Sequence, residues 1–342
     1  MTEQAHLAAR PALVPALARV TSPALGGRVH TLSGQSMGTT WMAKWVGTAG
    51  IDARAVDATI QRELQIVIDQ MSSWEPAATV CTFAQADAGT WVPIPDALRS
   101  VLQAALQVAE ASGGAFDPTA APLVDLWGFG PTPGFDRVGF RPPSAAAIAH
   151  ARARCGWRRL ALGHAGAWQA GGVQLDLSAI AKGHAVDRVC ERLLELGHDS
   201  LLVEIGGELR GHGVKPDGQP WWVAIERPPG CAASAPVVAA HDLAIATSGD
   251  YRRCWRSADG HLRSHTIDPR SGHPIEHGMA SVTVLHPRCM WADAWSTALM
   301  VLGLDAGLAL AERHRLAAHF VVRDAHGGAH AMSSSEWLAQ LQ

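Results

Sequence analysis

The sequence predicts an α+β fold made of one domain, a mixed sheet with helices packed against it. Segments with strand-like and helix-like patterns come in clusters and do not alternate strictly, which argues against a doubly wound sheet. No internal repeat and no long Ser/Gly or charged linker divides the 342 residues, although a chain of this length could also form two domains. We therefore expect an Ala/Pro-rich, mobile extension over residues 1–30 and a single domain over residues 31–342.

Two amphipathic helices are predicted in the first third of the chain. Apolar residues recur at three- and four-residue steps from Asp52 to Met71, which places them on one stripe of a helix. The same spacing predicts a second helix from Asp96 to Ala109. Ser112 and the two glycines after it end this helix, because glycine readily adopts the left-handed conformation that a helix end needs.

The middle of the chain predicts a strand, a helix and a strand in succession. Residues 173–177 have a strand pattern, apolar residues over 186–194 mark a helix that Gly197 ends, and residues 200–205 again have a strand pattern. Such a unit places the start of its helix at a surface crevice. The other elements that we expect are strands at 39–46, 221–226 and 281–285 and a helix over 293–302.

The composition excludes several classes of protein. With 28 basic and 31 acidic residues the formal charge is −3, so the broad basic surface of a nucleic-acid-binding protein is absent. No run approaches the roughly 18 apolar residues of a membrane-spanning helix. The six cysteines lie at least 23 residues apart without a CxxC pair, which excludes zinc-site and thioredoxin-like patterns. The thirteen Trp and 17 His, against one Tyr, have no explanation from the sequence alone.

The N-terminal residues lack the pattern of an export signal. The best apolar stretch, residues 12–18, is interrupted by Pro15, and no lipidation-type cysteine occurs in the first 80 residues. Scattered reduced thiols are the simpler interpretation of the cysteines, with disulfides as the alternative. We therefore expect a cytoplasmic protein.

One motif resembles the nucleophile elbow of hydrolases. Residues 34–38 have the pattern Gly-x-Ser-x-Gly, in which the serine, here Ser36, should lie between a strand and a helix. A strand pattern follows the motif instead, so the hydrolase interpretation is disfavoured. We expect Gly38 to serve a close backbone approach to a ligand or to a neighbouring strand.

An anion site is predicted where the segment 176–183 leads into a helix. Ser178 can cap the helix start and Lys182 falls in its first turn. Free backbone N–H groups, the positive end of the helix dipole and an ammonium group can then face one phosphate. The alternative is that Lys182 is an ordinary solvated helix residue. Neither a Walker A motif nor a complete GxGxxG motif occurs in the chain.

A metal site is the second candidate. Asp293 and Thr297 are four residues apart on a predicted helix, hence on one face, and both carry the oxygen ligands that suit Mg²⁺. The alternative is that the aspartate compensates the helix dipole while the threonine hydroxyl bonds back to the preceding turn.

Two Asp-Pro turns are predicted, and several histidines lie near the second of them in the sequence. Asp117-Pro118 and Asp268-Pro269 are turn formers by their local chemistry. Several histidines surround the second turn, but the Asp-Pro and Ser-Gly pairs among them break any helix. A single His as acid, base or phosphate partner is therefore favoured over a His-rich zinc site.

Taken together, these segments resemble the FAD:protein FMN transferase family, also called ApbE proteins. The resemblance extends from Ser36 to about Gly303. It rests on SMGTTW (36–41), MSSWEP (71–76), SGGAFDPTAAPLVDLWGFG (112–130), LDLSAIAKGHAVD (175–187), LLVEIGGELRGHG (201–213), IATSGDYRR (245–253), HTIDPRSGHP (265–274) and SVTVLHPRCMWADAWSTALMVLG (281–303).

The resemblance implies a reaction, a cofactor and a set of site residues. Members of this family split FAD at its pyrophosphate and attach the FMN half to a Ser or Thr hydroxyl of an acceptor flavoprotein, with Mg²⁺ required and AMP released. The residues implied in contact with FAD are Met37, Trp74, Ala115, Phe116, Asp117, Asp176, Lys182, His265 and Thr266. Those implied as metal ligands are the carbonyl of Ala179 with Asp293 and Thr297.

The resemblance also implies catalytic roles. Mg²⁺ and Lys182 would stabilise the charge that builds on the phosphate oxygens. His265 is the candidate base or phosphate partner, and Asp268 could orient it, unless that segment only shapes the pocket. Glu204 and Glu208 depart from residues common in relatives. Two further hypotheses therefore remain, an FAD pyrophosphatase that uses water in place of the acceptor and a non-catalytic FAD-binding protein.

Overall fold

A computed structural model describes residues 12–14, 27–47, 53–132, 134–137, 139–231, 236–256, 262–324 and 328–341. Most of the predicted extension, residues 1–30, lies outside these ranges. The predicted α+β fold is confirmed. Within the described ranges, no helix is both long enough and apolar enough to cross a bilayer.

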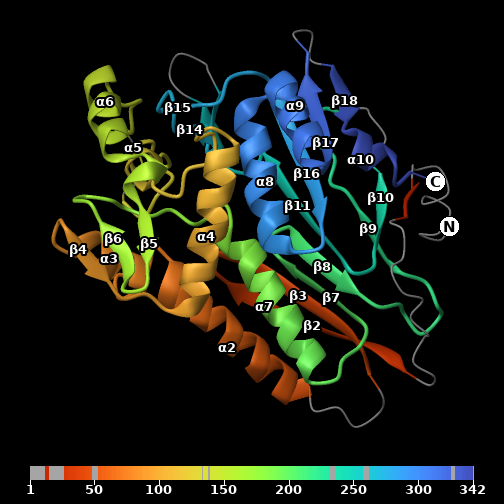
Figure 1. The fold of residues 1–342 in the computed structure, drawn as a ribbon. Helices are drawn as coiled ribbons and strands as arrows, with labels where there is room; N and C mark the ends of the chain where they lie inside the picture. Colours follow the sequence, from red (N-terminus) through yellow and green to blue (C-terminus); the bar gives the residue numbers. More distant parts are fainter. Residues whose placement is uncertain are drawn as a thin grey trace.

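An eight-stranded sheet forms the centre of the protein, in the order β18-β17-β16-β11-β8-β7-β3-β2 (Figure 1). Every neighbouring pair in it is antiparallel, and the one parallel pair among the described strands joins β1 to β10 in a small separate sheet. The strands of the large sheet are β2 (Arg28–Ser36), β3 (Thr39–Gly47), β7 (Leu201–Ile205), β8 (Glu208–His212), β11 (Leu243–Gly249), β16 (Met279–His286), β17 (Ala317–Arg323) and β18 (Ala329–Ser333).

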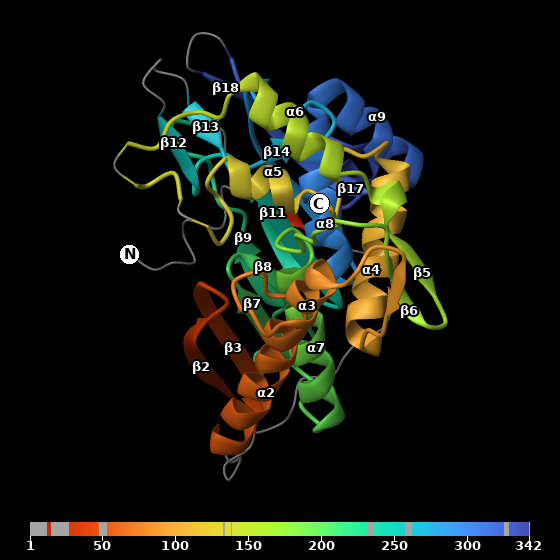
Figure 2. The same cartoon turned by 90° about the vertical axis from the view of Figure 1, so that its left-hand side faces the viewer.

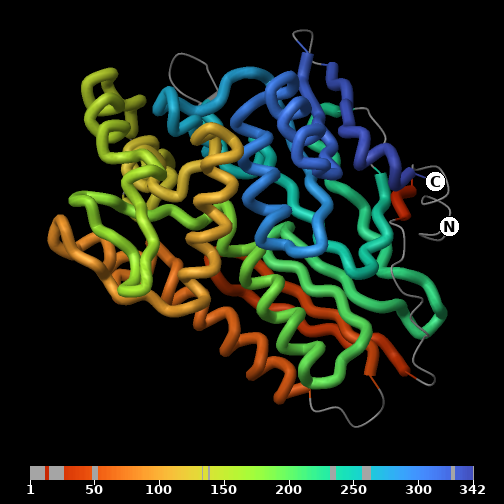
Figure 3. The backbone as a smooth tube through the Cα atoms, in the orientation of Figure 1, coloured from red at the N-terminus to blue at the C-terminus, as the bar shows by residue number. Residues whose placement is uncertain are grey.

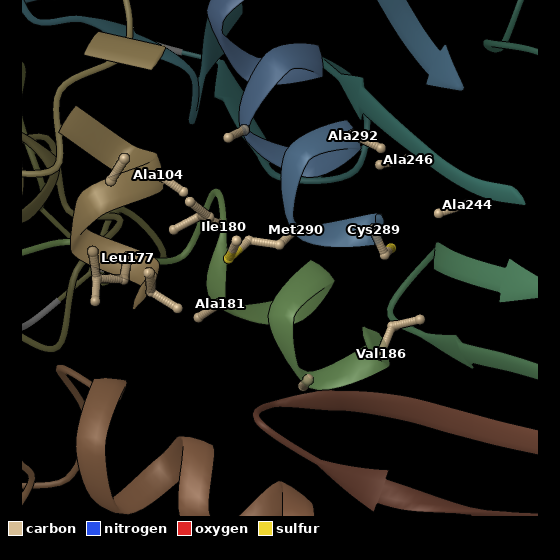
Figure 4. Close-up of a cluster of buried hydrophobic side chains, with 14 of the residues drawn as sticks. Ala104, Leu177, Ile180, Ala181, Val186, Ala244, Ala246, Cys289, Met290 and Ala292 are labelled. Atoms are coloured by element: carbon tan, nitrogen blue, oxygen red, sulfur yellow. The ribbon is translucent and has the colours of Figure 1, made fainter. Parts of the chain in front are cut away.

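Helices cover one face of this sheet and bury the main core between the two layers (Figures 1 and 2). They are α2 (Ala53–Met71), α4 (Asp96–Ala111), α7 (Ala181–Glu195), α8 (Cys289–Leu302) and α9 (Leu304–His314). Helices α2 and α7, more than a hundred residues apart, run side by side (Figure 3). Ile180 and Met290 meet in the core between α7 and α8 (Figure 4).

Smaller units surround the sheet and its helical layer. A second apolar cluster lies where β1 (Ala12–Leu13), β9 (Trp221–Ala224), β10 (Val237–Ala240) and α10 (Ser335–Leu338) meet the sheet. A third surrounds Leu123 and Trp127 and joins α5 (Ala121–Leu126), α6 (Ala145–Arg154), β12 (Cys254–Arg256) and β14 (Ile267–Asp268). The remaining elements are α3 (Thr79–Gln85), β4 (Thr90–Val92), η1 (Trp157–Arg159), β5 (Ala161–Gly163), β6 (Gly166–Gln169), β13 (Leu262–Ser264) and β15 (His273–Pro274).

The hairpin of β2 and β3 explains the Gly-x-Ser-x-Gly motif. Ser36 pairs with Thr39 across a two-residue turn in which both Met37 and Gly38 have positive φ, 50° and 70°. A Cβ atom on Gly38 would meet nothing within 4 Å. The expected close approach of Gly38 to a neighbouring strand is therefore wrong, because the glycine serves the left-handed turn conformation instead, while its approach to a ligand stays a prediction. Gly34 is the close approach, since its Cβ would lie 2.7 Å from Nε1 of Trp41 on the opposite strand.

The segment 173–177 departs from its predicted strand structure. It forms no ladder, because the side chain of Gln169 accepts the N–H of Val173 and the carbonyl of Pro118 accepts that of Asp176. The helix after it begins at Ala181, with Lys182 in its first turn as predicted, and ends before Gly197, whose φ of 87° confirms its predicted role. Ser178 does not cap this helix, because the N-cap position is Ile180 and Ser178 is exposed.

Histidine and tryptophan rings pack together, which accounts for part of the unusual aromatic composition. Five Trp rings lie against six imidazoles, with ring centroids 5.0 to 6.2 Å apart. The most parallel pairs are His30 with Trp45 and His319 with Trp337. These ring contacts depend on how the chain folds, so the residue pattern alone did not predict them.

Candidate active site

A group of charged residues, two of them buried, lies where α7, α8 and β8 meet. Lys182, in the first turn of α7, places its Nζ 2.5 Å from Oε1 of Glu208 at the start of β8. Asp293 of α8 is 3% exposed and lies close enough to influence the lysine charge. The alternative that Lys182 is an ordinary solvated residue is therefore wrong, because the lysine forms an ion pair with a buried carboxylate.

Burial and mutual charge set the protonation of this group. Burial alone would lower the pKa of Lys182, but Glu208 and Asp293 raise it above its ordinary value, which keeps the ammonium charged. Burial raises the pKa of Glu208 above its ordinary value, a rise that Lys182 opposes and Asp293 reinforces. Burial also raises the pKa of Asp293, against the effects of Lys182 and the Gly183 N–H. Two carboxylates, Glu208 and Asp293, therefore share the positive charge of one lysine. Such a site can bind an additional cation.

Helices α7 and α8 approach closely at Gly183. A Cβ atom there would lie 2.7 Å from the carbonyl carbon of Cys289 and 2.8 Å from Cβ of Asp293. The backbone N–H of Gly183 donates to Oδ2 of Asp293 at 3.0 Å. The absence of a side chain at this position thus allows the carboxylate of α8 to reach the first turn of α7.

The predicted metal ligands lie on elements that meet at this group. Asp293 is the fifth residue of α8, beyond its first turn, so it is not compensating the helix dipole. The Thr297 hydroxyl lies 2.9 Å from Oγ of Ser248 on β11, and it is Ser296 that bonds back to its own helix. Ala179 lies half-buried in the turn before α7. These oxygens fit a hard cation such as Mg²⁺.

Over the ranges that the structure covers, no three His, Cys, Asp or Glu side chains are grouped so that they could hold a metal ion. A cation at Asp293 would therefore depend on hydroxyl and carbonyl oxygens for its other ligands.

An open cleft lies next to the segment that leads into α7, since Asp176 and Ser178 are among its lining residues. Trp74 and Asp176, two of the predicted FAD contacts, line it together with Phe129 and Arg253. The Trp74 side chain is 60% exposed, which leaves its ring face available to a planar ligand. The lining of the cleft thus combines an aromatic ring, an acidic group and a cationic group.

Other predicted contacts lie deeper or outside the cleft. The side chains of Ala115 and Phe116 are buried at 1% and 4% exposure, so a ligand could meet this turn only through its backbone. The Asp117 carboxylate accepts hydrogen bonds from Thr119 and from the N–H of Trp157, which fixes the turn. Met37 lies in the β2–β3 turn and packs partly against the main core.

His265 contacts two residues that line the cleft, Arg253 and Phe129, and one of its ring nitrogens is already hydrogen-bonded. Its Nδ1 lies 3.0 Å from the carbonyl oxygen of Arg253, which can only accept a hydrogen bond, so Nδ1 carries the proton and Nε2 keeps its lone pair. Burial, reinforced by the charge of Arg253, lowers the pKa of His265 to about 4. The ring is therefore neutral at pH 7 and available as a proton acceptor. Thr266 beside it is buried at 7% exposure.

The predicted support of His265 by Asp268 is not what the structure shows. Asp268 forms a bidentate pair with Arg270, with both N···O distances 2.9 Å, and also accepts the backbone N–H of Arg270. Arg270, two residues further along the chain, thus forms all of these hydrogen bonds with the Asp268 carboxylate. The Arg253 carbonyl orients His265 instead, so Asp268 belongs to the turn.

Three residues of the site were missed or misjudged from the sequence. Glu208 was noted only as a departure, yet it is the ion-pair partner of Lys182. Arg253 lines the cleft and bonds His265, but nothing in its local pattern indicated this. Glu204, the other departure, accepts the N–H of Gly207 at 2.6 Å and stabilises the β7–β8 turn. Only the glycines of that turn could have suggested that residues 204 and 208 face the helix start.

Comparison with solved structures agrees with this fold. An apo-form structure of the Pseudomonas stutzeri flavinyl transferase ApbE superposes with a TM-score of 0.84 at 41% sequence identity, covering 92% of this chain and 97% of that one. The flavin transferase ApbE from Vibrio cholerae also gives 0.84, at 35% identity, covering 92% and 100% of the two chains. By its fold and its relatives this chain is a transferase.

Sequence comparison narrows the class to a family. The model of the ApbE family matches residues 37–320, and the chain belongs to that family. A relative from Vibrio cholerae named FAD:protein FMN transferase is 38% identical over 311 residues, which cover 90% of this chain and 91% of the relative. One of the same name from Haemophilus influenzae is 36% identical over 310 residues, with 88% of each chain covered.

Proposed function

We propose that this protein transfers the FMN half of FAD to a Ser or Thr hydroxyl of an acceptor flavoprotein, with Mg²⁺ bound at Asp293, Thr297 and the Ala179 carbonyl. The observation that carries the proposal is the ion pair of Lys182 with the buried Glu208, close to the buried Asp293, in a chain of the ApbE family. The relatives named FAD:protein FMN transferase support the choice of substrate.

The reaction exchanges one P–O bond for another. The acceptor hydroxyl oxygen bonds to the phosphorus of the FMN half, the bond from that phosphorus to the bridging oxygen breaks, and AMP leaves with the bonding electrons. Lys182 neutralises charge on the phosphate oxygens, because its ammonium stays charged between two carboxylates. Bound Mg²⁺ would add Lewis-acid stabilisation of the same charge. The hydroxyl proton moves to Nε2 of His265, whose Nδ1 is held by Arg253.

Trp74 and Asp176 support a role for the cleft in holding the planar and polar parts of FAD. The exposed indole offers a stacking face, and Asp176 lies where the segment before α7 lines the wall. Met37 and the backbone of 115–117 complete the proposed contacts, together with Thr266. Asp268 contributes only by forming the turn that follows His265.

The test is a covalent flavin assay. Purified protein, FAD and Mg²⁺ are incubated with proteins of a flavin-depleted cell extract, and flavin fluorescence is read on a denaturing gel while AMP is quantified. Fluorescence on a protein band with matching AMP is expected, and its absence would refute transfer. Release of free FMN and AMP without any acceptor would instead identify an FAD pyrophosphatase. FAD binding without either product would identify a non-catalytic FAD-binding protein.

The Asp293→Ala variant tests the metal assignment. Transfer should fall at least ~100-fold, the scale expected for losing a group that stabilises transition-state charge. Circular dichroism should show an unchanged fold. A variant with wild-type turnover would remove Asp293 from the site.

A further inference from the structure

Asp187 of α7 is fully buried and its carboxylate is surrounded by donors from two other elements. Oδ1 accepts the backbone N–H of Cys289 at 3.0 Å and Nη1 of Arg210 at 2.9 Å. Oδ2 accepts the backbone N–H of Met290 at 3.0 Å, and Nε of Arg288 lies 3.4 Å away. This one side chain thus touches the start of α8 and the middle of β8.

The contacts with α8 replace a cap that the helix itself lacks. The residue before α8 is Arg288, whose side chain makes no capping hydrogen bond, and the first turn of α8 carries no acidic residue. Free N–H groups at a helix start need an acceptor, and a negative charge there is favourable. Asp187 supplies both from a different helix. A cap of this kind fixes where α8 begins relative to α7.

The same carboxylate connects the three elements that carry the charged group. Lys182 is five residues before Asp187 on α7, Asp293 is three residues after Met290 on α8, and Glu208 is two residues before Arg210 on β8. We infer that Asp187 is a positioning residue for the candidate active site, which holds α7, α8 and β8 so that Lys182, Asp293 and Glu208 face one another. The inference rests on the proposed function for its link to Mg²⁺ and catalysis.

A second ion pair that holds α7, between Glu63 and Arg188, provides the matched control. Glu63 of α2 is also buried, and its Oε2 lies 2.5 Å from Nη2 of Arg188, the residue next to Asp187. This ion pair ties α2 to α7 and involves neither α8 nor β8. Glu63→Gln and Asp187→Asn therefore each neutralise one buried carboxylate that holds α7, but only the second disturbs the cap of α8.

The experiment measures Mg²⁺ affinity by isothermal titration calorimetry for wild type, Asp187→Asn and Glu63→Gln. Asp187→Asn should raise the dissociation constant at least ~10-fold, the scale seen when a residue that orients a metal ligand is lost. Its kcat should fall while KM for FAD changes little. Glu63→Gln should lower the melting temperature but keep the Mg²⁺ affinity. Unchanged affinity and kcat in Asp187→Asn would overturn the inference.

Hydrogen exchange separates this inference from the proposed function. Exchange at the first turn of α8 should accelerate in Asp187→Asn and stay slow in Glu63→Gln, whether or not the protein binds Mg²⁺. Wild type without Mg²⁺ affinity would refute the metal assignment, whereas equal exchange in the two variants would refute the role of Asp187. If Asp187→Asn does not fold, Asp187→Glu retains the charge but displaces it by one methylene. The same acceleration is then expected, and wild-type exchange would overturn the inference.

Discussion

Replacement of Gly183 by alanine should destabilise the protein although the residue lies in a helix. In an isolated helix this change stabilises by about 1 kcal/mol, because glycine loses more backbone entropy on folding. Here the new methyl group would lie 2.7 Å from the carbonyl carbon of Cys289 and 2.8 Å from Cβ of Asp293. Both are backbone or backbone-attached atoms, which cannot rotate away. Overpacking of this kind costs about 1 to 3 kcal/mol, and separation of the helices also weakens the Gly183 N–H bond to Asp293.

We expect a net loss of about 1 to 2 kcal/mol for Gly183→Ala, measured as a lower urea midpoint with an unchanged m-value. Gly307→Ala is the graded control, because the nearest atom to its new methyl group, the carbonyl oxygen of Leu299, would be 3.0 Å away. Its loss should be smaller. A Gly183→Ala variant as stable as wild type, or more stable, would show that helix propensity outweighs the contact and would refute this reasoning.

Two further predictions concern pH and the cleft. Burial lowers the pKa of His184 to about 4, so between pH 6.5 and 4 the unfolded state binds the proton first and the free energy of unfolding falls, by up to about 3 kcal/mol for this one group. The urea midpoint should therefore drop from pH 7 to pH 5, less so in His184→Asn, and a constant midpoint would contradict the burial effect. Trp74→Ala should weaken FAD binding about tenfold in a fluorescence titration while Trp74→Tyr retains it. Equal affinity in all three proteins would exclude stacking on this ring.

Local patterns in the sequence predicted the positions of helices and strands more accurately than they predicted which segments bond to one another. The stripe from Asp52 to Met71 became α2, and the two glycines after Ser112 have the positive φ values expected of a helix end. The strand predicted at 173–177 failed, because Gln169 and Pro118 take hydrogen bonds that a neighbouring strand would otherwise make. The alternation of apolar and polar residues does not reveal that such groups will accept the backbone N–H bonds of a segment.

The site residues that could be predicted are those whose signal lies within a few neighbouring positions of the sequence. Lys182 at a helix start and the Asp293/Thr297 spacing are visible in short windows, and the family resemblance joined them. The family resemblance left open whether Asp268 orients His265 or only shapes the turn, and the pairing of its carboxylate with Arg270 favours the turn. The roles of Glu208 and Asp187 depend on contacts across 26 and 102 residues, which only the folded chain reveals.

The cap of α8 by Asp187 also bears on the order in which the protein folds. The two groups are 102 residues apart, and the N–H of Gly183 meets Asp293 across 110 residues. Contacts of such long range form late, because the entropy of closing the loop must be offset before they contribute. A nascent chain that ends before α8 can form neither the cap nor the charged group. Ligand binding at this site would therefore report that synthesis has passed α8 and that α7, α8 and β8 have come together.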